Sequence, residues 1–121
     1  MAYEQVGSWA FILGVLIAII VGLLGAAAVL DATTLGYVEI VLVILGFVVG
    51  FVNIAADELN DFLTAAIALL LVAAAATVGG LVLIPYIGIY LAGMVSEIAL
   101  FVAPAALIVS LKAIFNMARS A

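Results

Sequence analysis

Residues 94–110 read MVSEIALFVAPAALIVS, an almost unbroken apolar run that contains one carboxylate, Glu97. The apolar segment around it extends from about 88 to 115, which exceeds the approximately 20 residues that a helix needs to cross about 30 Å of hydrocarbon. The run therefore predicts a membrane-spanning helix with an acidic residue near its middle.

The composition of the whole chain supports a membrane location. Of its 121 residues, 72% are hydrophobic, and the mean hydropathy is +1.67. A soluble domain of this size has too little interior to bury so much apolar surface. Charged residues make up 7% of the chain, against about 25% in soluble domains. Because polar and apolar residues do not alternate as they do in barrel strands, we expect a helical integral membrane protein.

Four apolar segments predict four helices. Short links separate them, so consecutive helices are expected to lie side by side in opposite directions. The predicted fold class is all-α, with residues 1–121 forming a single membrane domain. This domain is a compact antiparallel up-down bundle of four transmembrane helices at about 9–30, 37–54, 62–84 and 88–115.

The two basic residues, Lys112 and Arg119, predict the orientation, since both lie near the C-terminal end. The positive-inside rule places that end in the cytoplasm, and four spans place the N-terminus there too. Asp31 and Glu39 are then expected at the outer ends of the first two helices. Lys112 lies on the same side as the acidic loop 57–61, which predicts a salt bridge to one of its carboxylates, Asp57, Glu58 or Asp61.

Small residues recur at every fourth position of the predicted helices. Inside lipid, close van der Waals contact between small residues brings helices together. Such faces can join helices of one chain or different copies, and four helices offer more of them than one bundle needs, so we expect a homo-oligomer. The residues expected at these contacts are Gly14, Ala18, Gly22, Gly46, Gly50, Gly79, Gly80, Gly88, Ala92 and Ser96.

Glu97 is the most informative polar residue of the chain. It lies about nine residues inside its segment, or roughly 13 Å deep, where an acidic residue costs around 2.5–3.5 kcal/mol by insertion scales. No cation of the chain lies at this depth. We therefore expect a neutral Glu97 that hydrogen-bonds within the protein, with Thr77 as its first partner. Because membrane carboxylates also carry protons or cations, Glu97 and Thr77 form the candidate ion site.

The residue types exclude several kinds of chemistry. Cysteine and histidine are absent, which excludes thiolate chemistry and the usual zinc and haem sites. A basic stripe for nucleic acid is also absent. Asp31 and Glu39 could hold a hard cation, although solvated charge explains them as well, and the loop 57–61 lacks the ligand spacing of a calcium loop. We expect no enzyme, no catalytic residue, no cofactor and no metal site.

Two runs carry a resemblance to a known group of proteins. Residues 44–54, ILGFVVGFVNI, are followed after a short polar link by 62–71, FLTAAIALLL. These runs resemble small four-span membrane proteins of archaea and candidate-phylum bacteria. The resemblance implies a four-span fold, and it implies no functional residue, because that family has no assigned activity.

We therefore expect a membrane protein with a structural or assembly role, which forms homo-oligomers or arrays through its small-residue faces. A viral envelope or capsid subunit is one form of this role. The alternatives are an oligomeric ion or proton channel that uses Glu97 and an accessory subunit of a larger membrane complex. The expected partners are membrane lipids and further copies of the chain.

Overall fold

The structure is all-helical over the residues that it describes. The computed structural model describes residues 2–52, 59–75 and 80–120, and no strand occurs in these ranges. The predicted all-α class is therefore confirmed. The elements are α1 (Ala2–Ala26), α2 (Ala32–Val52), α3 (Leu59–Ala74), the short 3-10 helix η2 (Leu81–Leu83) and α4 (Gly88–Ser120).

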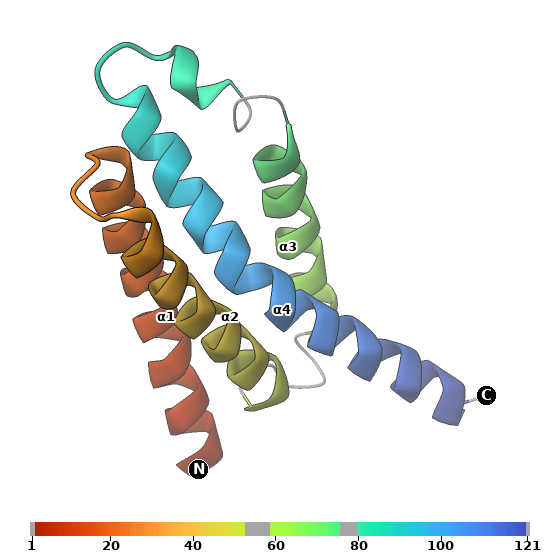
Figure 1. Ribbon diagram of the computed structural model, residues 1–121. Coiled ribbons are helices and arrows are strands. Elements are labelled where there is room, and N and C mark those ends of the chain that lie inside the picture. The colour runs from red at the N-terminus through yellow and green to blue at the C-terminus, as the bar shows by residue number, and fades with distance from the viewer. Residues whose placement is uncertain (1, 53–58, 76–79, 121) are drawn as a thin grey trace.

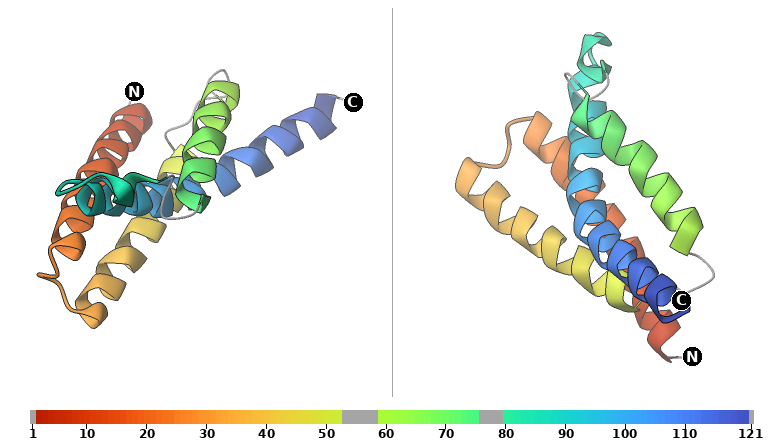
Figure 2. Two further views of the ribbon diagram at one scale, coloured as in Figure 1. Left: turned by 90° about the horizontal axis from the view of Figure 1, so that it is seen from above. Right: turned by 90° about the vertical axis from the view of Figure 1, so that its right-hand side faces the viewer.

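The fold is organised around α4, which contacts α1, α2, α3 and η2 (Figure 1). α1 and α2 form an antiparallel hairpin that packs against one side of α4, and α3 lies on the other side (Figure 2). As a result, α2 and α4 run in the same direction although they are neighbours. The start of α1 and the end of α4 lie toward the same end of the molecule.

Three of the helices are long and apolar enough to cross a membrane, and α3 is not. The candidate spans are Trp9–Ala26, Ala32–Val52 and Gly88–Arg119. α3 has 16 residues, which gives about 24 Å at 1.5 Å per residue. The helix expected over 62–84 thus ends at Ala74. After it, Gly80 has a φ of 83°, a left-handed conformation that a right-handed helix does not contain.

α1 ends four residues earlier than expected, because the chain turns at Ala28. The N–H of Ala28 donates to the Gly25 carbonyl at 3.1 Å, and that of Val29 donates to Leu24 at 3.0 Å. This pair of bonds closes the helix in the way that usually requires a glycine in the left-handed region. Here Ala28 takes that place with a φ of 60°.

α2 begins five residues earlier than expected, because Asp31 caps it. The Thr34 N–H donates to Asp31 Oδ1 at 3.0 Å, and the Leu35 N–H donates to the Asp31 carbonyl at 2.9 Å. Hydrogen bonds from the side chain and the backbone of Thr34 hold the pKa of the exposed Asp31 below its ordinary value. The earlier start places Glu39 about two turns inside α2 instead of at its outer end.

Glycines allow α4 to approach α1 until the two backbones touch. A Cβ atom on Gly22 would lie 2.6 Å from the carbonyl of Gly93, and one on Gly14 would collide with the Phe101 ring. These contacts pair low numbers on α1 with high numbers on α4, as antiparallel helices require. Ala18, midway between the two glycines, is fully buried.

Glycines perform the same function between α2 and α4. A Cβ atom on Gly46 would collide with the Phe101 carbonyl and would lie 2.6 Å from Cγ of Pro104. One on Gly50 would lie 2.9 Å from the Ala105 carbonyl. Numbers rise together on the two helices, which agrees with their parallel directions. The small residues of α1 and α2 therefore pack within one chain, so they do not support the expectation that these faces join copies.

The other residues expected at helix contacts have different positions. Gly88 packs against the Leu81 carbonyl of η2 and Ala92 is buried, while Ser96 is half-buried. Gly80 lies in the turn before η2 rather than on a helix face. Gly79 lies outside the described residues.

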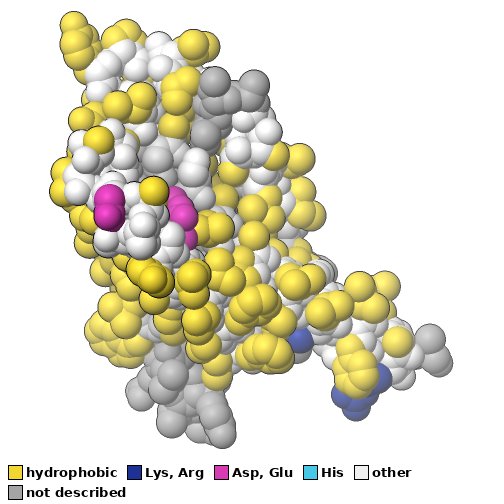
Figure 3. All heavy atoms as spheres, in the orientation of Figure 1, with side chains coloured by type: hydrophobic (Ala, Val, Ile, Leu, Met, Phe, Trp, Pro, Cys, Tyr) yellow, Lys and Arg dark blue, Asp and Glu magenta, His cyan; other side chains and the backbone are white. Residues whose placement is uncertain are grey.

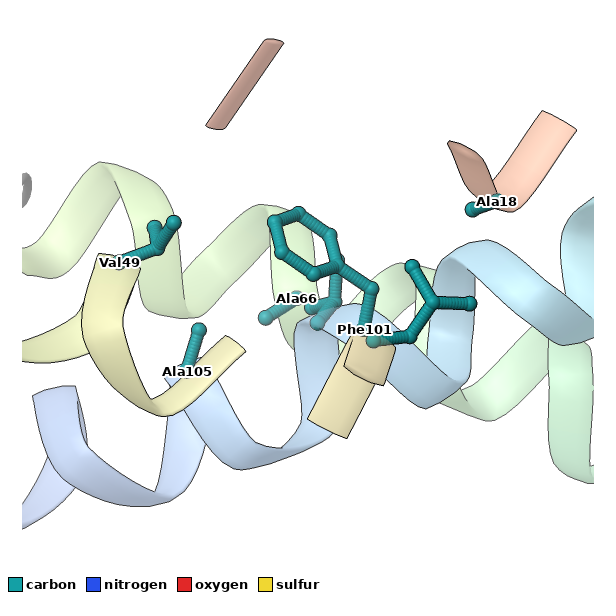
Figure 4. Packing of buried hydrophobic residues seen from close by; sticks show 7 residues of the cluster. Ala18, Val49, Ala66, Phe101 and Ala105 are labelled. Carbon is teal, nitrogen blue, oxygen red and sulfur yellow. The ribbon is translucent and has the colours of Figure 1, made fainter. Parts of the chain in front are cut away.

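The buried core lies where α4 crosses the other three helices. Figure 4 shows Phe101 near the centre of this cluster, and its ring meets that of Phe11 edge to face, with centroids 6.0 Å apart. Pro104 lies inside α4, where it removes a backbone hydrogen bond, and the second half of α4 leaves the direction of the first (Figure 1). The cluster consists of Ala18, Leu42, Val49, Ala66, Phe101, Val102 and Ala105.

Replacement of Gly22 by alanine tests the close approach of α1 and α4. We expect Gly22→Ala to lower the free energy of unfolding by about 1–3 kcal/mol, because the atoms in the way belong to the backbone and cannot rotate aside. The matched control is Gly36→Ala, since a Cβ there meets nothing within 4 Å. The control should be neutral or stabilising by about 0.5–1 kcal/mol. Unfolding of purified protein in detergent measures both, and equal effects would contradict the proposed contact.

The Asp31 cap predicts a loss of stability in acid. The folded-state pKa of Asp31 lies below its ordinary value of 3.8. Its contribution is therefore fully present above that value and is lost as the pH falls through the folded-state pKa. Asp31→Asn retains a capping group but should remove this part of the pH dependence, whereas Asp31→Ala should also destabilise the protein at pH 7. Unfolding measured at a series of pH values separates the two effects, and identical acid profiles for all three proteins would contradict the cap.

Candidate functional site

Glu97 lies on the face of α4 that packs against the α1–α2 hairpin. Gly93 and Phe101, one turn before and one turn after it, are both held against α1. The Glu97 side chain is only 9% exposed. Its Oε1 atom is buried and has no hydrogen-bond partner in the part of the chain that the structure describes. An unpaired buried polar atom is unfavourable, so its presence requires an explanation.

A second carboxyl group, that of Glu39, lies beside Glu97. The parallel packing of α2 and α4 brings Gly46 against Pro104. Seven residues, or two turns, before these positions are Glu39 and Glu97, so the same packing places the two acidic residues together. The two carboxyl groups are close enough to interact with each other. Glu39 is half-buried, so it is the more accessible member of the pair.

Small and apolar residues form the rest of the surroundings. On α1, the register set by Gly14 and Gly22 places the fully buried Ala18 opposite Glu97. The described side chains of α1, from Trp9 onward, include no ionisable group, and η2 has none. On α3 the only described carboxylate is Asp61, which is exposed in the first turn. On α4 itself, Tyr90 lies two turns before Glu97.

This arrangement can bind a proton between two carboxyl groups. Two negative charges repel strongly in an apolar environment, where the effective dielectric constant is low. When one carboxyl group is protonated, it can donate a short hydrogen bond to the other, and one negative charge remains instead of two. No group of three or more potential metal-binding side chains occurs among the described residues. The simplest ligand of the pair is therefore a proton.

The predicted site and the observed site share Glu97 and differ in its partner. Thr77, the expected partner, lies outside the described residues. Glu39 was assigned to the outer end of its helix because that helix was expected to begin near Tyr37. An Asp-Ala-Thr-Thr capping pattern at Asp31 was the signal in the sequence that would have moved the helix start and placed Glu39 at the depth of Glu97.

Lys112 is half-buried and contacts a helix end, not an acidic side chain. Its Nζ donates to the Phe51 carbonyl at 2.9 Å. The carbonyls at the end of α2 lack donors within their own helix and carry partial negative charge, which a lysine complements. No salt bridge joins Lys112 to Asp61 within the described residues. Asp57 and Glu58 lie outside them.

On the face of the molecule drawn in Figure 3, acidic and basic side chains lie apart. In Figure 3, acidic side chains in magenta lie in the upper part near the α1–α2 connection, and basic side chains in dark blue lie on the lower half of α4. Hydrophobic side chains cover most of the surface between them. Glu97 lies nine residues from the start of α4, and Lys112 and Arg119 lie in its second half, so the carboxyl pair is nearer the end of the molecule opposite to these two cations.

Comparisons with known proteins identify no relative. No protein-family model, curated protein or solved structure matches the chain. The resemblance to small four-span membrane proteins thus remains a prediction from two apolar runs. The function must be inferred from the carboxyl pair and its surroundings.

A stability measurement tests whether Glu97 holds the fold together. Glu97→Met keeps the length of the side chain and removes the unpaired buried oxygen, so we expect the free energy of unfolding to rise by about 1–3 kcal/mol. Ala92→Met, at a buried position five residues nearer the start of α4, is the control and should be destabilising through overpacking. Clear destabilisation by Glu97→Met would assign Glu97 a structural role instead.

Proposed function

We propose that the chain is an integral membrane protein that binds and releases a proton or a small cation within the membrane at the Glu39–Glu97 pair. The observation that supports this function is the buried, unpartnered Oε1 atom of Glu97 beside a second carboxyl group. An ionisable residue buried inside an apolar helix is typical of a functional site. In this proposal Glu97 is the buried acceptor, and Glu39 shares its ligand.

The surface of the helices supports placement in a bilayer. Large apolar side chains are exposed along the whole length of the candidate spans, where water would be an unfavourable neighbour. Lipid tails satisfy such a surface without any protein partner. Examples are Ile12, Leu16 and Ile20 on α1, Ile40 and Ile44 on α2, and Leu107 and Leu111 on α4.

The charge distribution supports an orientation. Lys112 and Arg119 both lie in the second half of α4, and the positive-inside rule places that end in the cytoplasm. The start of α1 lies toward the same end in Figure 1, so both termini are proposed to be cytoplasmic. The carboxyl pair then lies nearer the outer side of the membrane.

An assembly role receives less support than ligand binding. The small-residue faces of α1 and α2 that were expected to join copies are occupied by α4 of the same chain. Self-association would have to use larger apolar side chains, which lipid covers equally well. Conduction across the membrane would require several copies, because the interior between α1, α2 and α4 is filled by the buried cluster.

Proton uptake measures the proposed function directly. Purified protein in detergent should take up a proton on acidification that Glu97→Gln no longer takes up, because the amide cannot ionise. Glu39→Gln should shift the pH of this uptake, since it removes the carboxyl group that interacts with Glu97. Asp61→Asn is the matched control, because Asp61 is an exposed carboxylate at the other end of the molecule. Equal uptake by wild type and both glutamine variants would contradict the proposal.

A further inference from the structure

We infer that the Glu39–Glu97 pair is a proton site that opens to water on one side of the membrane only, the side of the α1–α2 connection, and is closed toward the end that carries Lys112. This inference rests on the proposed function, and it specifies the ligand and the side from which the ligand arrives. The site is thus a sensor of the pH on that side and not part of a path across the membrane.

On the open side, acidic groups become more exposed step by step. Glu97 is buried, Glu39 is half-buried, and Asp31 at the start of α2 is exposed. Glu39 lies seven residues from the start of α2, or roughly 10 Å along the helix. A proton from water therefore meets Glu39 first and reaches Glu97 through the contact between the two carboxyl groups.

On the closed side, apolar packing begins one turn beyond Glu97. Phe101 is 1% exposed; its ring packs on Gly14 of α1, and its backbone carbonyl packs on Gly46 of α2. The only hydroxyl of α4 between Phe101 and Lys112 is that of Ser110, which donates to the Leu107 carbonyl at 2.9 Å. The next ionisable side chain of α4, Lys112, lies fifteen residues from Glu97, or about 22 Å along the helix. No described side chain of α2 from 40 to 52 is ionisable.

The surroundings favour a proton over a metal ion. Calcium takes 6–8 oxygen ligands at about 2.3–2.6 Å, and magnesium needs a nearly ideal octahedron. The pair supplies two carboxyl groups. Ala18, opposite Glu97 on α1, and Phe101, one turn further along α4, supply no side-chain oxygen. A proton needs only one oxygen from each carboxyl group.

Protonation at this position acts on the contact between α2 and α4. When both carboxyl groups are ionised, their repulsion pushes the two helices apart. Two turns further along, the same helices are in contact through Gly46 and Pro104. Gly46 has no side chain that could move to absorb a change in the distance between the helices. Protonation removes the repulsion and favours the packed arrangement.

Labelling in sealed vesicles tests the one-sided access. A membrane-permeant carbodiimide reacts with protonated carboxyl groups in apolar surroundings, and mass spectrometry measures the fraction of Glu97 that is modified. The chain contains no cysteine, so the substitution Thr33→Cys, at an exposed position in the first turn of α2, reports which side that end faces when treated with an impermeant maleimide. The pH inside and outside the vesicles is then set independently, with the membrane potential clamped.

We expect the rate of Glu97 labelling to follow only the pH on the side where the maleimide reacts with the Thr33→Cys variant. Above the midpoint the rate should fall about tenfold for each unit of pH on that side, and it should not respond to the other side. A response to both sides, or to the Lys112 side only, would overturn the one-sided access while leaving the proton uptake in detergent intact. Protection from labelling by sodium or calcium ions at constant pH would overturn the assignment of the ligand as a proton. Absence of both labelling and proton uptake would instead contradict the proposed function itself.

Discussion

The contact of the α4 backbone with those of α1 and α2 is the constraint on which the rest of the fold depends. In lipid, apolar side chains gain nothing by leaving the solvent, so helices associate through close packing. Gly22 and Gly93 allow this between α1 and α4, and Gly46 allows it between α2 and α4. These contacts fix one antiparallel and one parallel register, and together the two registers determine which side chains surround Glu97.

The position of the carboxyl pair is therefore a consequence of packing and not of local sequence around the acidic residues. Any shift of α2 along α4 by one turn would separate Glu39 from Glu97 and would also drive Gly46 away from Pro104. One register between α2 and α4 thus fixes both the glycine contact and the position of the carboxyl pair. Evolutionary replacement of these glycines would affect the site without touching either glutamate.

Much of the fold follows from hydropathy, because membrane helices must satisfy their own backbone hydrogen bonds. This requirement made α1, α2 and α4 predictable from the apolar runs. The spacing of small residues predicted that Gly14, Gly22, Gly46 and Gly50 lie at helix contacts, but it did not predict which helix each glycine contacts. Glu97 was identified as the central polar residue from its depth alone. The end of α3 was not predictable from hydropathy, because residues 75–84 are as apolar as a helix interior while Gly80 turns the chain.

The partner of Glu97 was missed for a different reason. Consecutive helices were expected to be neighbours, which directed attention to the third helix and Thr77, whereas the neighbour that supplies the carboxyl group is α2. Pairing between α2 and α4 is a long-range relation that depends on where all the helices pack. The predicted start of α2 was a second cause of the missed partner. The continuous apolar run begins near Tyr37, whereas the helix begins five residues earlier, at the Asp31 cap, and includes two threonines.

The central place of α4 also has a consequence for how the protein is made. Synthesis proceeds from the N-terminus, so α1 and α2 are made before α4 exists. Until then, the glycine face of α2 and the carboxyl group of Glu39 lack the helix against which they pack in the structure. The core is buried only when α4, which follows the other three helices in the chain, has been synthesised, and no earlier intermediate contains the site. The faces of α1 and α2 that pack against α4 are therefore exposed until α4 has been synthesised. During this time quality-control proteases can act on the incomplete chain.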